Sequence, residues 1–243
     1  MKEILLLRAK SEEYTRTFNA AGYQPSFIEP LSFTFTNEHR LRDCLSDATY
    51  DGLVLTSPRA ITAVSRQWDP NTVPMCFALV YVVGIASAQE AEELLGVKAK
   101  GTEAGNSQAL AQIIIQETAS SKKKFLFPCG NLASDNMVQS LQKAGLEVDT
   151  LPVYNTIENS ELSTLLSTTK TPSALVFFSP SGCKFVYKHL QNSNKQLASL
   201  PQFAIGPTTA RSLEQQGVKV ARIANTPCPL DLIACLDLYF NMD

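Results

Sequence analysis

Hydroxyl, amide and glycine residues follow several short apolar runs of this chain, each at a place where a helical pattern begins. In α/β proteins such positions bind anions, because the first N–H groups of a helix lack partners within the helix and its dipole favours negative charge. Ser, Thr and Asn also cap helices for structural reasons alone, and the sequence leaves both roles open for each residue. Because they recur in both halves of the chain, we expect them to bind carboxylate or phosphate together: Thr56, Ser57, Ser87, Asn106, Ser107, Gly130, Asn131, Ser179, Ser181, Gly182, Thr208 and Thr209.

Few other residues suggest chemistry. Tyr154 can donate a hydrogen bond to a ligand, although an aromatic residue at a strand end can equally serve packing. His39 and His189 are expected to be surface or packing residues, and Cys129 has no neighbouring His or Lys that would activate its thiol. The sequence has no Gly-x-Ser-x-Gly, Gly-x-Gly-x-x-Gly or Gly-x-x-x-x-Gly-Lys-Ser/Thr motif. Hydrolases, dehydrogenases and nucleoside triphosphatases therefore lose their main support.

The elements that position these residues occur twice. Ser57 and Ser179 both stand in Ser-Pro after an apolar run, and Gly84 and Gly206 both follow one, with the same offset of 122 (179 − 57 and 206 − 84). The segment from Lys2 to Phe33 likewise resembles the segment from Lys124 to Asn155. Such a repeat predicts two similar lobes, and we expect them to present matching loops to a ligand in a cleft.

Apolar runs alternate with helical periodicity, which predicts an α/β fold with parallel sheets. Periodicity leaves two arrangements open: two tandem lobes, or an exchange in which residues 1–30 join residues 160–243. We expect Pro207 and Pro229 to lie in the first turns of helices. The predicted strands lie near residues 3–7, 25–29, 52–56, 78–83, 97–100, 124–128, 147–153, 173–178, 202–206 and 218–223.

Composition excludes several classes of protein. The net charge is −2, so nothing marks a nucleic-acid surface or a polybasic membrane patch. The six cysteines include no Cys-x-x-Cys pair and there are two histidines, so we expect no structural zinc site and free thiols in a reducing compartment. The N-terminal apolar run is too short for a secretory signal, and we expect a cytosolic protein without a membrane span.

Five strings resemble, in the right order, the uroporphyrinogen III synthase family in its eukaryotic form. They begin at Leu55 (Leu-Thr-Ser-Pro-Arg-Ala), Leu126 (Leu-Phe-Pro-Cys-Gly-Asn), Val153 (Val-Tyr-Asn-Thr), Phe177 (Phe-Phe-Ser-Pro-Ser-Gly) and Ala204 (Ala-Ile-Gly-Pro-Thr-Thr-Ala-Arg). The resemblance implies two flavodoxin-like lobes, each a parallel sheet flanked by helices. Lobe 1 would comprise residues 1–30 with 160–243, lobe 2 residues 34–153, and a two-stranded hinge ladder residues 31–33 with 154–159.

The resemblance also implies a function. The linear tetrapyrrole hydroxymethylbilane would be cyclised with inversion of ring D to uroporphyrinogen III, through azafulvene and spiro intermediates, without a metal or organic cofactor. It implies a monomeric lyase of heme biosynthesis that receives its substrate by transient hand-over from hydroxymethylbilane synthase. Tyr154 would hydrogen-bond the departing hydroxyl, and Thr208 and Thr209 would contact carboxylates. Two other classes stay in view: a two-lobed receptor for a small anion, and a sugar-nucleotide transferase.

Overall fold

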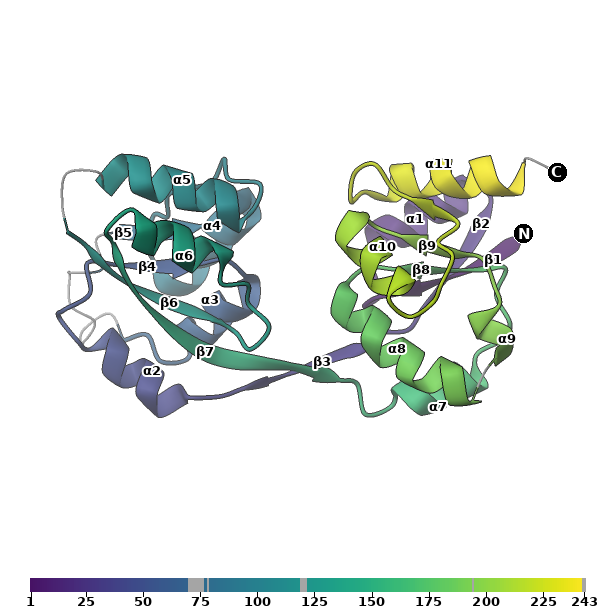
Figure 1. The fold of residues 1–243 in the computed structure, drawn as a ribbon, viewed down its shortest axis with the longest axis horizontal. Helices are drawn as coiled ribbons and strands as arrows, with labels where there is room; N and C mark the ends of the chain where they lie inside the picture. Colours follow the sequence, from purple (N-terminus) through teal and green to yellow (C-terminus); the bar gives the residue numbers. More distant parts are fainter. Residues whose placement is uncertain (70–76, 78, 119–121, 194, 242–243) are drawn as a thin grey trace. The chain divides into compact units, whose positions relative to one another are not determined.

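The computed structural model describes residues 1–69, 77, 79–118, 122–193 and 195–241. The chain divides into two compact units, which are described here one at a time. Unit 1 comprises Met1–Ser32 and Ile157–Asp243, and unit 2 comprises Phe33–Thr156. Each unit has one sheet covered by helices (Figure 1). No helix in the described ranges is both long enough and apolar enough to cross a membrane.

Unit 1 contains a parallel sheet in the order β10-β9-β8-β1-β2. Numbered along the chain within the unit, this order is 2-1-3-4-5, which is the flavodoxin-like order. The first βαβ segment of the chain thus shares a sheet with the C-terminal part. The elements are β1 (Lys2–Leu7), α1 (Glu12–Ala20), β2 (Tyr23–Phe27), α7 (Leu162–Thr168), β8 (Ala174–Phe177), α8 (Pro180–Ser193), α9 (Lys195–Ala198), β9 (Gln202–Ala204), α10 (Pro207–Glu214), β10 (Arg222–Ile223) and α11 (Pro229–Phe240).

Unit 2 contains a sheet in the order β3-β7-β6-β4-β5. The pairs β4–β5, β4–β6 and β6–β7 are parallel, so these four strands repeat the β2-β1-β8-β9 part of unit 1. The elements are β3 (Leu31–Phe35), α2 (Glu38–Leu45), β4 (Gly52–Leu55), α3 (Pro58–Ser65), β5 (Leu79–Val82), α4 (Gly84–Leu95), α5 (Ser107–Thr118), β6 (Lys124–Gly130), α6 (Asn136–Lys143) and β7 (Glu147–Glu158).

Strands β3 and β7 are neighbours, and both cross the border between the units. The N–H of Thr36 donates to the carbonyl of Val153 at 3.0 Å, and the N–H of Asn159 donates to the carbonyl of Pro30 at 3.1 Å. Residue numbers therefore rise along one strand while they fall along the other, which is an antiparallel pairing.

The two faces of each sheet are buried against different cores, because successive side chains of a strand point to opposite faces. In β1, Ile4 and Leu6 pack in one apolar cluster and Leu5 and Leu7 in another. In β4, Val54 likewise faces away from the cluster that holds its neighbours. This double burial explains why the strands read as continuous apolar runs.

One predicted strand is wrong. Residues 97–100 form no strand, and only Lys100 makes a single parallel bridge, with Tyr81 of β5. Gly96 and Gly101 stand on either side with φ of +69° and +82°, so the backbone turns at both ends and the segment is too short to pair further. Pro207 and Pro229 begin α10 and α11, as predicted.

Candidate functional site

Tyr154 of β7 lies beside the start of α3 in unit 2. Its hydroxyl oxygen is 3.1 Å from Oγ of Ser57, the residue that follows Thr56 after β4. Ser57 Oγ also accepts the backbone N–H of Ala60 at 3.2 Å and thereby caps α3. The cap holds the serine hydroxyl in place, so Tyr154 meets an oxygen of fixed position.

Gly130 lies under the ring of Tyr154. The pairing of β6 with β7 shifts in register between Cys129 and Gly130, and Gly130 is then opposite Tyr154. A Cβ atom at position 130 would lie 2.6 Å from Cζ and 2.8 Å from the hydroxyl oxygen of Tyr154. Only glycine leaves room for the ring in this position.

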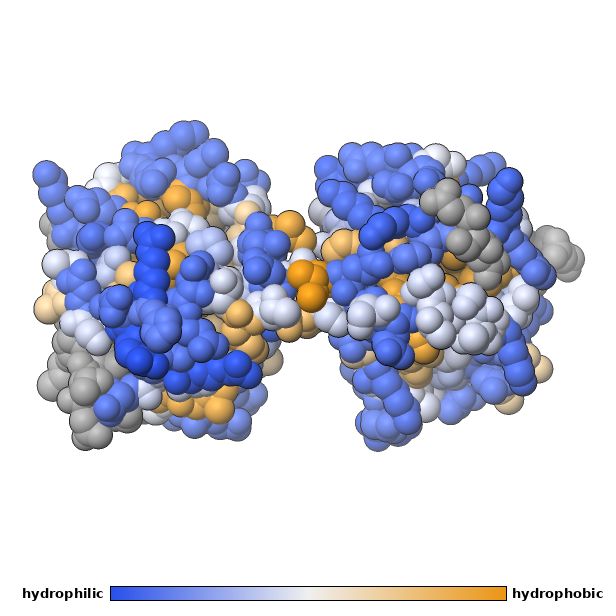
Figure 2. Space-filling model, turned by 90° about the horizontal axis from the view of Figure 1, so that it is seen from below, coloured by the Kyte–Doolittle hydropathy of each residue, from blue (hydrophilic) through white to orange (hydrophobic). Residues whose placement is uncertain are grey.

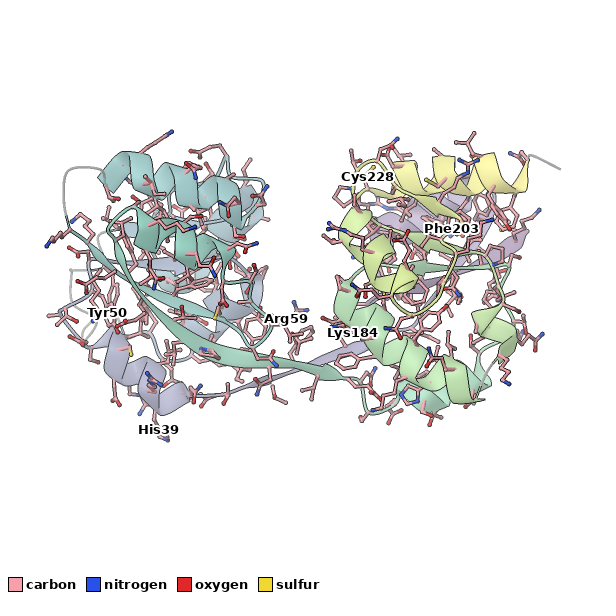
Figure 3. The ribbon with its side chains drawn as sticks, viewed as in Figure 1. His39, Tyr50, Arg59, Lys184, Phe203 and Cys228 are labelled. Carbon is pink, nitrogen blue, oxygen red and sulfur yellow. The ribbon has the colours of Figure 1, made fainter. Side chains whose placement is uncertain are left out.

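Phe33 and Arg59 complete this group, and sequence reasoning did not select either of them as a site residue. The Arg59 guanidinium lies 3.3 Å from the centre of the Phe33 ring, and Phe33 meets the Tyr154 ring edge to face with 6.3 Å between ring centres. Arg59 is exposed at the start of α3 and is labelled in Figure 3. The sequence could have identified Arg59 as a site residue, because Arg59 directly follows Thr-Ser-Pro. Phe33 could not be identified in this way, because its contact with Tyr154 depends on the pairing of β3 with β7.

These residues gather where ligands commonly bind in such sheets. In open α/β sheets that place is the carboxyl edge of the strands, where the strand order reverses. In unit 2 the reversal falls between β4 and β6, the strands that lead to Ser57 and Gly130. We therefore take Ser57, Gly130 and Tyr154 as the centre of the candidate active site.

Unit 1 repeats part of this arrangement at the offset of 122. Ser179 Oγ accepts the N–H of Gly182 at 3.0 Å, just as Ser57 accepts the N–H of Ala60. A Cβ atom on Gly182 would lie 3.1 Å from Ser179 Oγ and 3.2 Å from Cγ of Pro30. The N–H of Gly182 is thus already used inside the protein.

The comparison with known families identifies the chain. Residues 12–234 match the family model described as "Uroporphyrinogen-III synthase HemD". The chain belongs to the uroporphyrinogen-III synthase family. It is 26% identical to a Saccharomyces cerevisiae protein named uroporphyrinogen-III synthase, and the match covers 97% of this chain and 96% of the yeast protein. The expected family resemblance is confirmed.

Solved structures of the uroporphyrinogen-III synthase family have the same fold. A mutant uroporphyrinogen III synthase from Thermus thermophilus aligns with a TM-score of 0.65 at 14% identity, covering 100% of both chains. A uroporphyrinogen-III synthetase from Helicobacter pylori aligns with a TM-score of 0.65 at 19% identity, again over 100% of both chains. The predicted α/β class with two helix-flanked parallel sheets is confirmed.

The other residues that we expected to bind substrate in this uroporphyrinogen-III synthase family member differ in how much of their surface is exposed. Thr208 is exposed at the start of α10, whereas Thr209 and its repeat equivalent Ser87 are buried, with 2% and 6% of their surface exposed. Contact through the side chain is therefore simplest for Thr208. Thr56, Ser107 and Ser181 are half-buried beside the starts of α3, α5 and α8.

The two asparagines bind backbone groups. Asn106 Oδ1 accepts the N–H groups of Gln108 and Ala109 at 3.0 and 2.9 Å, which caps α5. Asn131 Oδ1 accepts the N–H of Thr156 at 2.9 Å and ties the end of β6 to β7. The Oδ1 atom of each asparagine is therefore already bonded to the backbone and is less available to a ligand.

Cys129, His39 and His189 have surroundings that do not favour a catalytic role. Burial raises the pKa of the Cys129 thiol to about 11, so it is protonated at neutral pH. His39 is exposed on α2 (Figure 3), and His189 Nε2 lies 2.6 Å from a Glu158 carboxylate oxygen. Cys76 lies outside the described residues. Within the described ranges no three His, Cys, Asp or Glu side chains are grouped so as to hold a metal ion.

The face of the molecule drawn in Figure 2 is mainly hydrophilic. Ile85 and Leu132 are the two most exposed large apolar residues among those described in unit 2, with 66% and 59% of their surface exposed. Ile85 is in the first turn of α4 and Leu132 follows Asn131 after β6. Both therefore follow the carboxyl ends of strands in unit 2, and they offer apolar contact there.

Proposed function

We propose that this protein cyclises hydroxymethylbilane with inversion of ring D and releases uroporphyrinogen III. Membership of the uroporphyrinogen-III synthase family supports the reaction. The pair formed by the Tyr154 hydroxyl and Ser57 Oγ, 3.1 Å apart at the strand-order reversal of unit 2, carries the assignment of the site.

The reaction begins with loss of the ring A hydroxyl, which leaves with a proton as water. The resulting azafulvene is electrophilic and is attacked by the substituted α-carbon of ring D, which gives a spiro intermediate. Fragmentation of that intermediate and recombination through the other α-carbon invert ring D, and a proton is lost to restore the pyrrole. By this net loss of water the protein is a lyase.

Tyr154 assists the first step by donating its O–H to the departing hydroxyl. Ser57 Oγ already accepts the Ala60 N–H, and its own O–H can donate to the Tyr154 oxygen. In that orientation the phenol proton is free to face the substrate. A hydrogen bond to the leaving group is worth more as negative charge develops on it, so the contact favours the transition state over the ground state.

Most of the remaining work is positioning. The pyrroles supply both nucleophile and electrophile, so no metal or organic cofactor is required by this scheme, and the protein must hold one folded shape of the chain. We propose that helix starts and the exposed hydroxyl of Thr208 bind the substrate carboxylates, while Ile85 and Leu132 contact pyrrole rings. Ser87 and Thr209 would contribute through backbone N–H groups. Transient hand-over from hydroxymethylbilane synthase and a cytosolic location stay predictions.

The product isomer tests this proposal. Freshly prepared hydroxymethylbilane is incubated with the protein, the product is oxidised, and the isomers are separated by chromatography. We expect isomer III at a rate proportional to protein concentration. Isomer I alone, at the rate of the spontaneous reaction, would overturn the proposal, including when the protein binds hydroxymethylbilane without converting it.

A further inference from the structure

Unit 1 has a pocket of about 280 Å³ between α8 and α10. Thr208 and Ser212 are separated from Lys184 by more than twenty residues in sequence, and the contact of α8 with α10 brings them together. Ser212 Oγ donates to the carbonyl of Pro180 at 3.2 Å, which joins the two helices at this point. The pocket is lined by Pro180, Lys184, Thr208, Arg211, Ser212 and Gln215.

The lining has two cations and no carboxylate. Lys184 and Arg211 are both exposed, and neither is paired with a carboxylate within the described residues. Arg211 donates its Nε–H to the carbonyl of Pro207 at 3.4 Å, which directs the guanidinium toward the start of α10 and leaves its two terminal amino groups available. Figure 3 labels Lys184 on α8.

The start of α10 adds to this field. Gly206 precedes the helix and provides no side-chain cap, and Pro207 has no N–H, so the N–H groups of the next residues point out of the helix end. Thr208 is in the first turn of α10 and also lines the pocket, so an anion that binds its hydroxyl would meet both cationic side chains and lie near the positive end of the helix dipole.

The internal repeat provides a comparison with the same architecture. At the offset of 122, Thr62, Ala86, Gln89 and Glu90 of unit 2 correspond to Lys184, Thr208, Arg211 and Ser212. Unit 2 thus lacks both cations and has a carboxylate instead, and Thr62 Oγ1 lies 3.5 Å from Glu90 Oε1. The two helices are present in both units, so the cations are a property of unit 1 and not a requirement of the fold.

We propose that the pocket formed by Lys184, Thr208 and Arg211 is a carboxylate-binding site that holds a carboxylate side chain of the linear tetrapyrrole. This inference rests on the proposed function for the identity of the ligand. It makes the two units unequal, since the equivalent positions hold two cations in unit 1 and none in unit 2. It adds two cationic side chains to the helix starts and the Thr208 hydroxyl that we propose to bind the carboxylates.

Removal of both charges tests the site in turnover. For Lys184→Gln/Arg211→Gln we expect KM for hydroxymethylbilane to rise about 10- to 100-fold with kcat largely kept, because charge-assisted hydrogen bonds to the bound carboxylate are lost. The charge-conserving Lys184→Arg/Arg211→Lys should retain most of the affinity. Arg16→Gln/Lys98→Gln, which removes the same charge from exposed positions elsewhere, is the matched control and should leave KM within twofold. A KM for the double Gln variant within twofold of this control would overturn the inference.

A second measurement does not depend on turnover. Citrate is titrated into ¹⁵N-labelled protein, and we expect amide shifts at Thr208, Thr209 and Arg211 but not at Ala86 or Gln89, with loss of the shifts in the double Gln variant. If those shifts are absent, the pocket is not a carboxylate-binding site, even when the protein forms isomer III. If the wild-type protein yields only isomer I, the proposed function fails by itself, and the citrate titration still decides the pocket.

Discussion

The ring of Tyr154 lies on the backbone of Gly130, where a Cβ atom would be 2.6 Å from the ring carbon that bears the hydroxyl. The contact joins the end of β6 to β7 at the register shift and sets the height of the phenol above the sheet. Gly130 therefore positions Tyr154, in addition to any contact that its own backbone makes with a ligand.

Gly130→Ala should displace Tyr154 and lower kcat about tenfold or more. The added methyl group overlaps the ring, and relief of such overpacking costs about 1–3 kcal/mol or moves the side chain. Gly105→Ala is the control, because no atom lies within 4 Å of its would-be Cβ, and it should keep kcat. Turnover and urea unfolding are measured for both variants. Gly130→Ala with wild-type kcat would show that the ring position does not matter.

Tyr154→Phe should lower kcat about tenfold while the free energy of unfolding changes little. The ring still packs against Phe33 and Gly130, and only the hydroxyl that we propose as the donor to the leaving group is lost. A factor of ten corresponds to about 1.4 kcal/mol, the size of one hydrogen bond.

Tyr50 provides the opposite case in the same unit. The Tyr50 ring is buried, and its hydroxyl donates a hydrogen bond to the Asp149 carboxylate at 2.8 Å, away from the candidate site. Tyr50→Phe should therefore reduce the free energy of unfolding by about 1.5–3 kcal/mol, the contribution of a hydrogen bond to a charged group, and leave kcat unchanged. If both variants lose stability and turnover in equal proportion, Tyr154 has only a packing role.

The internal repeat allowed part of the fold to be predicted from the sequence. Equal spacing of Ser57 and Ser179 predicted equivalent strand ends, and the two serines indeed make the same helix cap. The predicted strand at residues 97–100 failed because an apolar run does not reveal that the glycines on either side both turn the backbone.

The candidate site could be predicted from the sequence only in part. Hydroxyl residues after strands could be selected one by one, but their exposure could not, so Thr208 and the buried Thr209 read alike. Contacts that depend on pairing were missed for the same reason. Phe33 meets Tyr154 because β3 pairs with β7, and Lys184 and Arg211 line one pocket because α8 packs on α10. Such contacts have no local signature in sequence.

Acid should destabilise unit 2 through Asp51 and Asp149. The backbone N–H of Lys124 lowers the pKa of Asp51 against a smaller effect of burial, and the Lys123 ammonium adds a still smaller decrease. The Tyr50 hydroxyl followed by the Lys124 ammonium lowers the pKa of Asp149 against a smaller effect of burial. A carboxyl whose pKa is lower in the folded state stabilises the protein above its ordinary pKa, near 3.8 here, and this contribution is lost as pH falls through the folded value.

We therefore expect the free energy of unfolding of unit 2 to be level near neutral pH and to fall from about pH 5 downward. Trp68 is the single tryptophan of the chain and packs against the unit 2 core, so its fluorescence in urea reports this unit. Asp51→Asn should be less stable than wild type at pH 7, and the difference should shrink as pH falls below about 4, because protonation removes the same interactions. Asp43→Asn, on an exposed position of α2, should follow the wild-type curve. An Asp51→Asn curve parallel to that of wild type from pH 7 to pH 3 would show that this carboxylate does not supply the acid sensitivity.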